Sequence, residues 1–242
     1  MLKRWVRRLA AFALAASLFV GVASELWYRS LLPDDLPTAP PPPVSARARE
    51  IVWQDCGTPG PPRLERSWPP FFVGTLAQLT VEGLLEPRHE RHENRRCLAG
   101  QAARLLDRRP PRRTPRYLVD QLALATWVQR NWTAQQALDF VAANVWMGEG
   151  ARGVEVASAS LFGRPTEALT IDEAALLVGI VRSPRGNDPR CRPDRARDAR
   201  DAVLDRLLEN AQITPREREE AVATPLTVHG DCPSPPPVPD RS

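Results

Sequence analysis

The sequence predicts a mainly α-helical protein behind one N-terminal hydrophobic segment. Two apolar runs follow a hydroxyl residue that has Gln or Glu three positions later, at Thr133 and Thr170, which is the capping-box pattern of a helix start. Alternating polar and apolar residues, which indicate strands, are nearly absent. The hydrophobic segment is the apolar run from Leu9 to Ser24.

This N-terminal run is flanked as a membrane anchor would be. Four basic residues precede it, namely Lys3, Arg4, Arg7 and Arg8, and Trp27 and Tyr28 follow it. The run is shorter than the roughly 20 residues of a full span, but its apolar neighbours can extend it at the membrane interfaces. A cleavable signal peptide is the alternative, since Val22-Ala23-Ser24 is an acceptable cleavage site. In both cases the positive-inside rule places residues from 30 onward outside the cytoplasm.

Proline-rich stretches suggest the domain boundaries. We expect a basic segment and transmembrane anchor at residues 1–30 and a Pro-rich stalk at 31–66. A helical domain at 67–225 and a Pro-rich tail at 226–242 complete the chain. Pro40–Pro43 should adopt extended polyproline II geometry and hold the domain away from the bilayer.

Within the predicted domain, periodicity and start signals predict a series of helices. The expected helices cover residues 70–85, 98–106, 116–130, 133–145, 154–162, 171–181 and 194–210, with a short last one capped by Thr214 and Glu217.

A glycine-hinged loop and a buried helix form the central stretch. The loop carries Gly148, Gly150 and Gly153 and opens onto the small-residue helix at 154–162. After a tight turn at Gly163, the helix at 171–181 is apolar on most faces, so we expect it to be buried. Pro184 should end it.

Charge and cysteine content narrow the classes of function. The net charge is +4, yet basic and acidic residues are interleaved along the chain, which is typical of a solvated surface and argues against a nucleic-acid-binding protein. The four cysteines are compatible with two disulfides in an oxidising compartment, with three possible pairings. Their spacing matches no metal-binding motif.

The central stretch resembles the last signature block of the family 51 glycosyltransferases, which polymerise peptidoglycan. That block combines a glycine loop, a Phe-Gly-Lys-Pro turn and a Leu-Thr-x-x-Glu-Ala-Ala-Leu-Leu helix. The corresponding residues here are Gly148-Glu149-Gly150, Gly153-Val154-Glu155, Phe162-Gly163-Arg164-Pro165, Leu169-Thr170 and Glu173-Ala174-Ala175-Leu176-Leu177. The likeness extends to about residue 210. It implies a lysozyme-like helical domain behind a single N-terminal membrane anchor.

The family's catalytic motifs are eroded in this chain. Extending a glycan chain needs a base for the acceptor hydroxyl and positive charge for the departing diphosphate. By resemblance to the first motif, Glu82 is the candidate catalytic base and His89 a candidate substrate-binding residue. Gln101 and Arg104 match the glutamine and the cation of the second motif, although Asn94-Arg95-Arg96-Cys97 replaces its Gly-Gly-Ser-Thr signature.

The later motifs give the remaining candidates. The glutamate of the third motif falls on Gln121 without a gap, or on Asp120 behind Arg116 with one inserted residue. Asp120 is the second catalytic candidate, and Arg116 is a candidate for substrate binding. Asp139 from the fourth motif, and Glu149 and Glu155 beside the glycine loop, are further candidates for substrate binding. A purely structural role is the competing interpretation for each of these side chains.

Two functions from different classes fit these residues. The first is a divergent peptidoglycan glycosyltransferase that polymerises lipid-linked disaccharide-pentapeptide on the periplasmic side of the cytoplasmic membrane. The second is a pseudoenzyme that binds glycan or acts as a cell-wall assembly subunit, with a transpeptidase as a conceivable partner. The only cofactor that the resemblance suggests is a divalent cation, Mg²⁺ or Mn²⁺, at the diphosphate of an active enzyme. A lysozyme-like hydrolase is a third interpretation, based on architecture alone.

Overall fold

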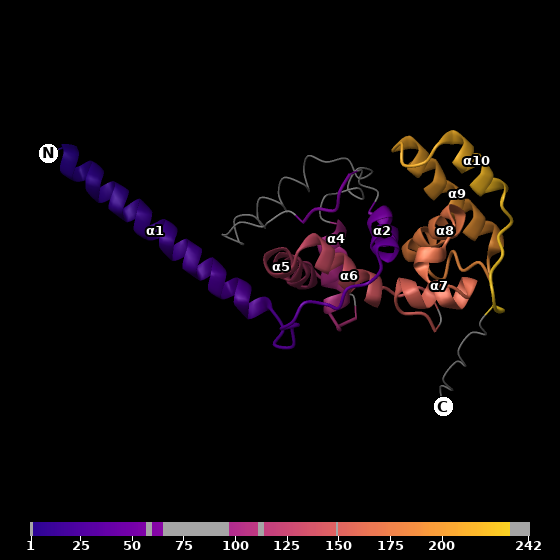
Figure 1. The fold of residues 1–242 in the computed structure, drawn as a ribbon. Helices are drawn as coiled ribbons and strands as arrows, with labels where there is room; N and C mark the ends of the chain where they lie inside the picture. The colour runs from indigo at the N-terminus through magenta and orange to yellow at the C-terminus, as the bar shows by residue number, and fades with distance from the viewer. Residues whose placement is uncertain (1, 57–59, 65–96, 111–113, 149, 233–242) are drawn as a thin grey trace, which may run out of the picture. The chain divides into compact units, whose positions relative to one another are not determined.

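The chain is almost entirely helical over the residues that its structure, a computed structural model, describes, which are 2–56, 60–64, 97–110, 114–148 and 150–232. Figure 1 shows these residues as a succession of helices. Within the described ranges, β-structure is limited to an isolated bridge between Trp146 and Arg152. The mainly helical class is therefore confirmed. The helix expected at residues 70–85 lies outside the described residues.

The chain divides into two compact units. Unit 1 comprises Met1–Pro40 and Arg63–Ala134, and unit 2 comprises Pro41–Pro62 and Gln135–Ser242. The helical domain expected at 67–225 is thus shared between two units, and part of the expected stalk belongs to unit 2.

Unit 1 begins with the long helix α1, Leu2–Leu31, which contains the whole apolar run of the N-terminus. Several large apolar side chains of α1 are exposed, including Phe12, Leu14, Leu18 and Phe19. A search of the described residues finds no helix that combines the length and the apolar character of a membrane span. The membrane anchor therefore remains a prediction from the sequence.

The body of unit 1 is the pair α4, Cys97–Leu106, and α5, Pro115–Asn131. The two helices pack through small and aliphatic residues of both, which are Leu98, Ala99, Ala102, Ala103, Ala123, Leu124 and Val128. Thr114 caps α5 by accepting a hydrogen bond from the amide of Tyr117, and Pro115 occupies the first turn, where no amide hydrogen is needed. The end of α1 packs on α5 through Tyr28 and Leu31, which cluster with Ala123.

Unit 2 contains a helix that we did not predict. Helix α2, Ala46–Asp55, lies inside the segment expected to be a stalk. Ser45 caps it by accepting a hydrogen bond from the amide of Ala48, and its apolar face of Ala48, Ile51 and Val52 is buried. The spacing of these residues is that of an amphipathic helix. The helix is short, however, and it follows Pro40–Pro43, whose prolines favoured the prediction of a stalk.

The central helix of unit 2 is α8, Ile171–Arg182, which is buried on most faces as expected. It packs mainly against α9, Pro193–Glu209, and α2. Gly179 permits the close approach of α8 to α9, since a Cβ there would lie 3.0 Å from that of Ala199. The remaining helices are α6, Ala134–Asn144; α7, Val154–Phe162; the 3₁₀ turn η2, Thr166–Ala168; and α10, Pro215–Ala223. Each α-helix predicted between residues 98 and 210 begins and ends within one or two residues of its predicted bounds.

Covalent and polar links hold the end of the described chain in unit 2. Cys191 and Cys232 form a disulfide, and none of the four cysteines is free. The side chain of Arg200, only 1% exposed, donates hydrogen bonds to the carbonyls of Val222 and Thr224 at the C-terminal end of α10. A buried arginine needs such acceptors, because an unpaired buried charge is strongly destabilising.

The glycine loop between α6 and α7 is a tight turn closed by backbone hydrogen bonds. The amide of Met147 donates to the carbonyl of Ala151, and the amide of Gly153 donates to the carbonyl of Val145. Gly153 has a φ of 93°, and a Cβ at this position would lie 2.8 Å from the carbonyl oxygen of Ala143. Both the backbone conformation and the lack of space therefore require glycine.

We predict that Gly153→Ala destabilises the protein more than Gly150→Ala. Gly150 also has a positive φ, 78°, but a Cβ there meets nothing within 4 Å. Backbone strain alone should cost about 1 kcal/mol at Gly150, whereas strain plus the clash should cost about 3 kcal/mol at Gly153. These costs correspond to drops in thermal midpoint of roughly 2–4 °C and 6–12 °C, measurable by circular dichroism. Equal drops for the two variants would contradict the steric account.

Candidate functional site

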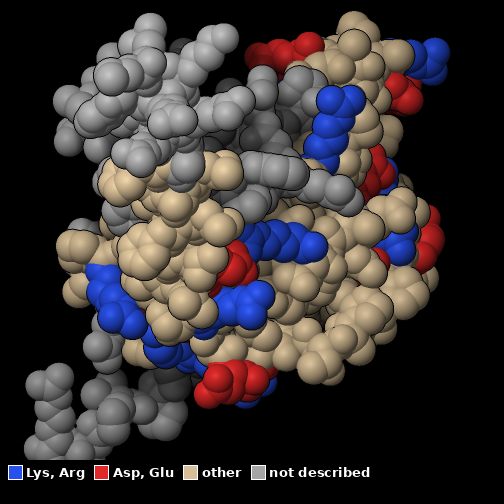
Figure 2. Space-filling view, turned by 90° about the vertical axis from the view of Figure 1, so that its left-hand side faces the viewer, with Lys and Arg blue, Asp and Glu red and all other residues tan. Residues whose placement is uncertain are grey.

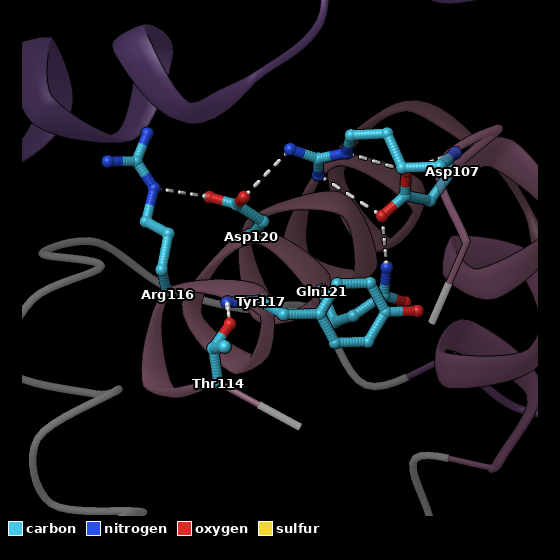
Figure 3. Close-up of polar contacts among 7 residues, drawn as sticks. Asp107, Thr114, Arg116, Tyr117, Asp120 and Gln121 are labelled. Atoms are coloured by element: carbon cyan, nitrogen blue, oxygen red, sulfur yellow. Dashed lines mark hydrogen bonds and ion pairs between the residues drawn. The ribbon is translucent and has the colours of Figure 1, made fainter. Parts of the chain in front are cut away.

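The acidic candidate Asp120 belongs to a polar cluster in unit 1, which we call the Arg109 cluster: Asp107, Arg109, Arg116, Asp120 and Gln121. Asp107 follows the last residue of α4, while Arg116, Asp120 and Gln121 come from the first turns of α5. Figure 3 shows Arg116 reaching Asp120 and Gln121 pointing toward Asp107. The cluster therefore ties the end of one helix to the start of the next.

Arg109 bridges two buried carboxylates. Its Nε and Nη2 donate to Asp107 at 2.8 and 3.1 Å, and its Nη1 donates to Asp120 at 2.9 Å. The side chains of Asp107 and Asp120 are 2% and 5% exposed, whereas that of Arg109 is 56% exposed. Two buried negative charges are thus neutralised by one cation that is open to solvent on its other side.

The remaining contacts complete the coordination of both aspartates. The other oxygen of Asp120 accepts from Nε of Arg116 at 3.2 Å. Asp107 also accepts the backbone amide of Arg109 at 3.0 Å and the side-chain amide of Gln121 at 2.7 Å. The residue that matches the family's glutamate without a gap, Gln121, therefore serves to hold Asp107.

The protonation of the cluster follows from these contacts. Burial raises the pKa of Asp107, but the hydrogen bonds and charge of Arg109, together with the amide of Gln121, outweigh burial and hold the pKa below its usual value. The same hydrogen bonds to Asp107 and Asp120 raise the pKa of Arg109. Asp107 and Arg109 are therefore charged and paired at neutral pH.

The other described candidates lie apart from this cluster or in unit 2. Gln101 is half-buried on α4, and Arg104 is exposed in the last turn of that helix. In unit 2, Asp139 is 5% exposed and accepts hydrogen bonds from the backbone amide of Val44 and from Arg49 Nε, at 3.0 and 2.7 Å. The candidates Glu82, His89 and Glu149 lie outside the described residues.

Glu155 holds the start of α7 against the 3₁₀ turn η2. Its carboxylate accepts from the hydroxyl of Thr166 at 2.6 Å and from the backbone amide of the same residue at 3.2 Å. Burial raises the pKa of Glu155, but hydrogen bonds from Ser45 and Thr166 outweigh it and lower the pKa below its usual value. These contacts fit the structural role that competes with substrate binding.

Most described acidic candidates are paired with arginine, and this bears on cation binding. The described residues contain no group of three or more His, Cys, Asp or Glu side chains that could hold a metal ion. Because Arg109 occupies the space between Asp107 and Asp120, these two carboxylates do not suit a divalent cation. On the face shown in Figure 2, acidic side chains lie beside basic ones rather than leaving a broad surface of one sign.

The two residues at the centre of the cluster, Asp107 and Arg109, were not predicted from the sequence. A local signal exists for them. Asp188 and Arg190 make the same contacts two residues apart, with the aspartate accepting the backbone amide, Nε and Nη2 of the arginine. Aspartate side chains often bond the amide two residues later, and arginine adds a two-pronged ion pair. The Asp-x-Arg pattern after a helix could therefore have indicated both pairs.

We predict that Arg109→Gln destabilises the protein by about 2 kcal/mol, because it leaves two buried carboxylates with fewer donors. Arg116→Gln removes the same charge from a side chain that is 75% exposed, so it should cost less than about 1 kcal/mol. Thermal unfolding of the two variants at neutral pH measures the difference. An Arg116 variant as unstable as the Arg109 variant would contradict the central position of Arg109.

Acid should reduce the difference between the parent and the Arg109→Gln variant. The pKa of Asp107 is lower in the folded state than the value of about 3.9 expected when unfolded, so its contribution to stability is present above pH 4. That contribution is lost as pH falls through the folded pKa. Thermal midpoints of the two proteins, measured from pH 7 to pH 3, should therefore converge below about pH 4. A constant difference across this range would show that Arg109 does not act through Asp107.

Comparison with known proteins relates the segment that contains the Arg109 cluster to a protein family. Residues 97–208 match the transglycosylase family model. The chain is 37% identical over 116 residues to penicillin-binding protein 1A of Aquifex aeolicus, covering 48% of this chain and 16% of that protein. It is 33% identical over 111 residues to penicillin-binding protein 1A of Mycobacterium tuberculosis, covering 46% and 13%. A protein of Cupriavidus necator that is described as a transglycosylase is 30% identical over 106 residues. This match covers 44% of this chain and 46% of that protein.

The match is therefore to one segment of larger proteins, and the chain spans about a sixth of the length of the Aquifex relative. Among solved structures, penicillin-binding protein 1A of Haemophilus influenzae aligns with a TM-score of 0.38 and 20% identity, over 55% of this chain and 16% of that one. The agreement of the family model with several separate relatives supports the resemblance seen in the motifs. Residues 97–208 belong to the transglycosylase family, the family 51 glycosyltransferases, as a divergent member.

Proposed function

We propose that this protein is a divergent, membrane-anchored peptidoglycan glycosyltransferase-like protein that binds the lipid-linked disaccharide-pentapeptide or the glycan strand made from it. The observation that carries the proposal is the match of residues 97–208 to transglycosylases, a segment in which the glycine loop before α7 keeps its family sequence. A lysozyme-like arrangement of the helices is part of the same proposal.

The proposed anchor is α1. A helix of its 30 residues is about 45 Å long, which exceeds the roughly 30 Å thickness of the hydrocarbon core. The sequence supports the proposal through the apolar run from Leu9 to Ser24 and the basic residues before it. This orientation places the rest of the chain on the periplasmic side, where a lipid-linked substrate would meet it. A cleaved leader would place the chain in the same compartment without the anchor.

In the proposed reaction, Glu82 takes the proton of the acceptor hydroxyl as that oxygen bonds to the anomeric carbon of the donor. The bond from this carbon to the diphosphate breaks at the same time, and the diphosphate leaves with the electron pair. Asp120 does not suit the role of base, since both of its oxygens accept hydrogen bonds from arginine. Asp107 and Asp120 are paired with arginine, so Mg²⁺ or Mn²⁺ at the diphosphate would need ligands other than these two carboxylates.

The alternative function is a pseudoenzyme that binds precursor or glycan and acts in cell-wall assembly, alone or with a transpeptidase. The observation that favours it is the state of the later motifs. Gln121 and Asp120, the two residues that match the catalytic glutamate of the third motif, are both engaged in the Arg109 cluster. The absence of the Gly-Gly-Ser-Thr signature from the sequence also favours the pseudoenzyme.

Polymerisation of labelled lipid-linked disaccharide by the full chain in detergent tests the proposal. We expect saturable binding of the precursor and, if the enzyme turns over, glycan strands that are lost in Glu82→Gln. General-base catalysis contributes about 10²–10⁴-fold, so the loss should be at least a hundredfold. Glu90→Gln, which removes the same charge eight residues later, is the matched control and should keep full activity.

The outcomes separate the candidate functions. Binding without strands from any variant supports the pseudoenzyme. Strands from both the parent and Glu82→Gln would show that another residue is the base. Neither binding nor strands, from protein whose circular dichroism shows it to be folded, would contradict both functions.

A further inference from the structure

A pocket lies in unit 1 where α1 ends and α5 begins. It has a volume of about 300 Å³, which is at the lower end of the range for small-ligand sites. Its lining includes the apolar residues Leu31, Leu32 and Leu106 and the guanidinium-bearing residues Arg108, Arg109 and Arg116. Such a pocket suits an amphiphilic ligand whose polar group is an anion.

Arg116 is the donor best placed for a ligand. Its Nε donates to Asp120, while its two terminal nitrogens have no hydrogen-bond partner among the residues that the structure describes. Figure 3 shows these nitrogens pointing away from Asp120. Since Arg109 also holds Asp120 in place, Arg116 is oriented by a fixed carboxylate and presents a two-pronged donor, the geometry that binds phosphate best.

Arg108 supplies a second cation at the rim of the pocket. It pairs with Asp35 at 3.2 Å, and the two side chains are 84% and 58% exposed. An ion pair so exposed contributes little to stability, so a phosphate can replace the carboxylate of Asp35 at little cost.

The charge of the residues around the pocket also favours an anionic ligand. The described residues 104–110 and 114–116 contain four arginines and one aspartate, and α5 has no acidic residue in its first turn to offset its positive N-terminal dipole. Asp107 and Asp120 line the pocket as well, but both are neutralised within the Arg109 cluster.

We propose that this pocket binds the phosphate of an anionic phospholipid. The lipid belongs to the membrane leaflet from which the C-terminal end of α1 emerges. The inference rests on the anchoring of α1 in the proposed function, because only then does the pocket lie at the lipid headgroups. The apolar lining residues contact the glycerol and the first acyl carbons, and Arg108 and Arg116 bind the phosphate. A lipid is favoured over free phosphate because four of the eleven lining residues, namely Leu31, Leu32, Pro33 and Leu106, are apolar. Basic pockets beside membrane helices bind acidic headgroups in this manner.

Native mass spectrometry of the full chain in a neutral detergent tests this site. Phosphatidylglycerol and phosphatidylcholine with identical acyl chains are titrated separately, and the affinity of the first bound lipid is measured. We expect phosphatidylglycerol to bind at least tenfold more tightly. The double variant Arg108→Gln/Arg116→Gln should weaken phosphatidylglycerol binding about twenty-five-fold, since each charge near the surface contributes about fivefold.

Two further variants make the test specific. Arg197→Gln/Arg216→Gln removes the same charge from exposed surface pairs in unit 2 and should change phosphatidylglycerol affinity less than twofold. Arg108→Gln alone leaves the Arg109 cluster intact, so it reports about a fivefold loss even if the double variant fails to fold. Equal binding of the two lipids, or an unchanged affinity in Arg108→Gln, would overturn the proposal.

Inorganic phosphate and the lipid-linked disaccharide complete the experiment. Inorganic phosphate that displaces phosphatidylglycerol at a similar concentration would identify a free-phosphate site and overturn the proposal. Binding of the lipid-linked disaccharide is measured on the same preparation. If it is absent while Arg108-dependent phosphatidylglycerol binding persists, the proposed function fails and the lipid site stands.

Discussion

The ion pairing of Arg109 with two buried aspartates is the constraint on which unit 1 depends. Asp107 at the end of α4 and Asp120 on α5 could not both remain charged and buried without it. By satisfying both, Arg109 fixes the turn between the helices. It also leaves the terminal nitrogens of Arg116 pointing away from Asp120, at a pocket that Leu31 and Leu32 also line. Arg109 therefore stabilises the fold, and it also leaves Arg116 as the cation that can bind a ligand.

Unit 2 uses acidic residues in a comparable way. Asp139 binds Arg49 and the amide of Val44, and Glu155 binds Thr166, so both carboxylates connect the helical body to the segment around α2 or to η2. Two residues singled out for substrate binding thus have structural partners. For Glu155, this explains how the sequence can keep the family's last signature block while its catalytic motifs change, because that block is also needed for folding.

Regular features of the sequence predicted the helices from residue 98 to residue 210, because capping residues, glycines and apolar periodicity are local signals. The capping box of Thr170 and Glu173 is present as expected. Helix α2 was missed, since its burial depends on packing against α8, far along the chain. The Arg109 cluster was missed for a similar reason: the sequence identified Asp120 as chemically suitable, but its partner comes from a loop after another helix.

Hydrogen exchange of the full chain in detergent, with and without the lipid-linked disaccharide, tests the central claim most directly. The claim is that the transglycosylase-family segment, residues 97–208, binds this precursor. We predict that the precursor slows amide exchange within this segment, and that phosphatidylglycerol protects only the residues at the junction of α1 and α5. Saturable precursor binding that leaves every amide of residues 97–208 unchanged would contradict the account.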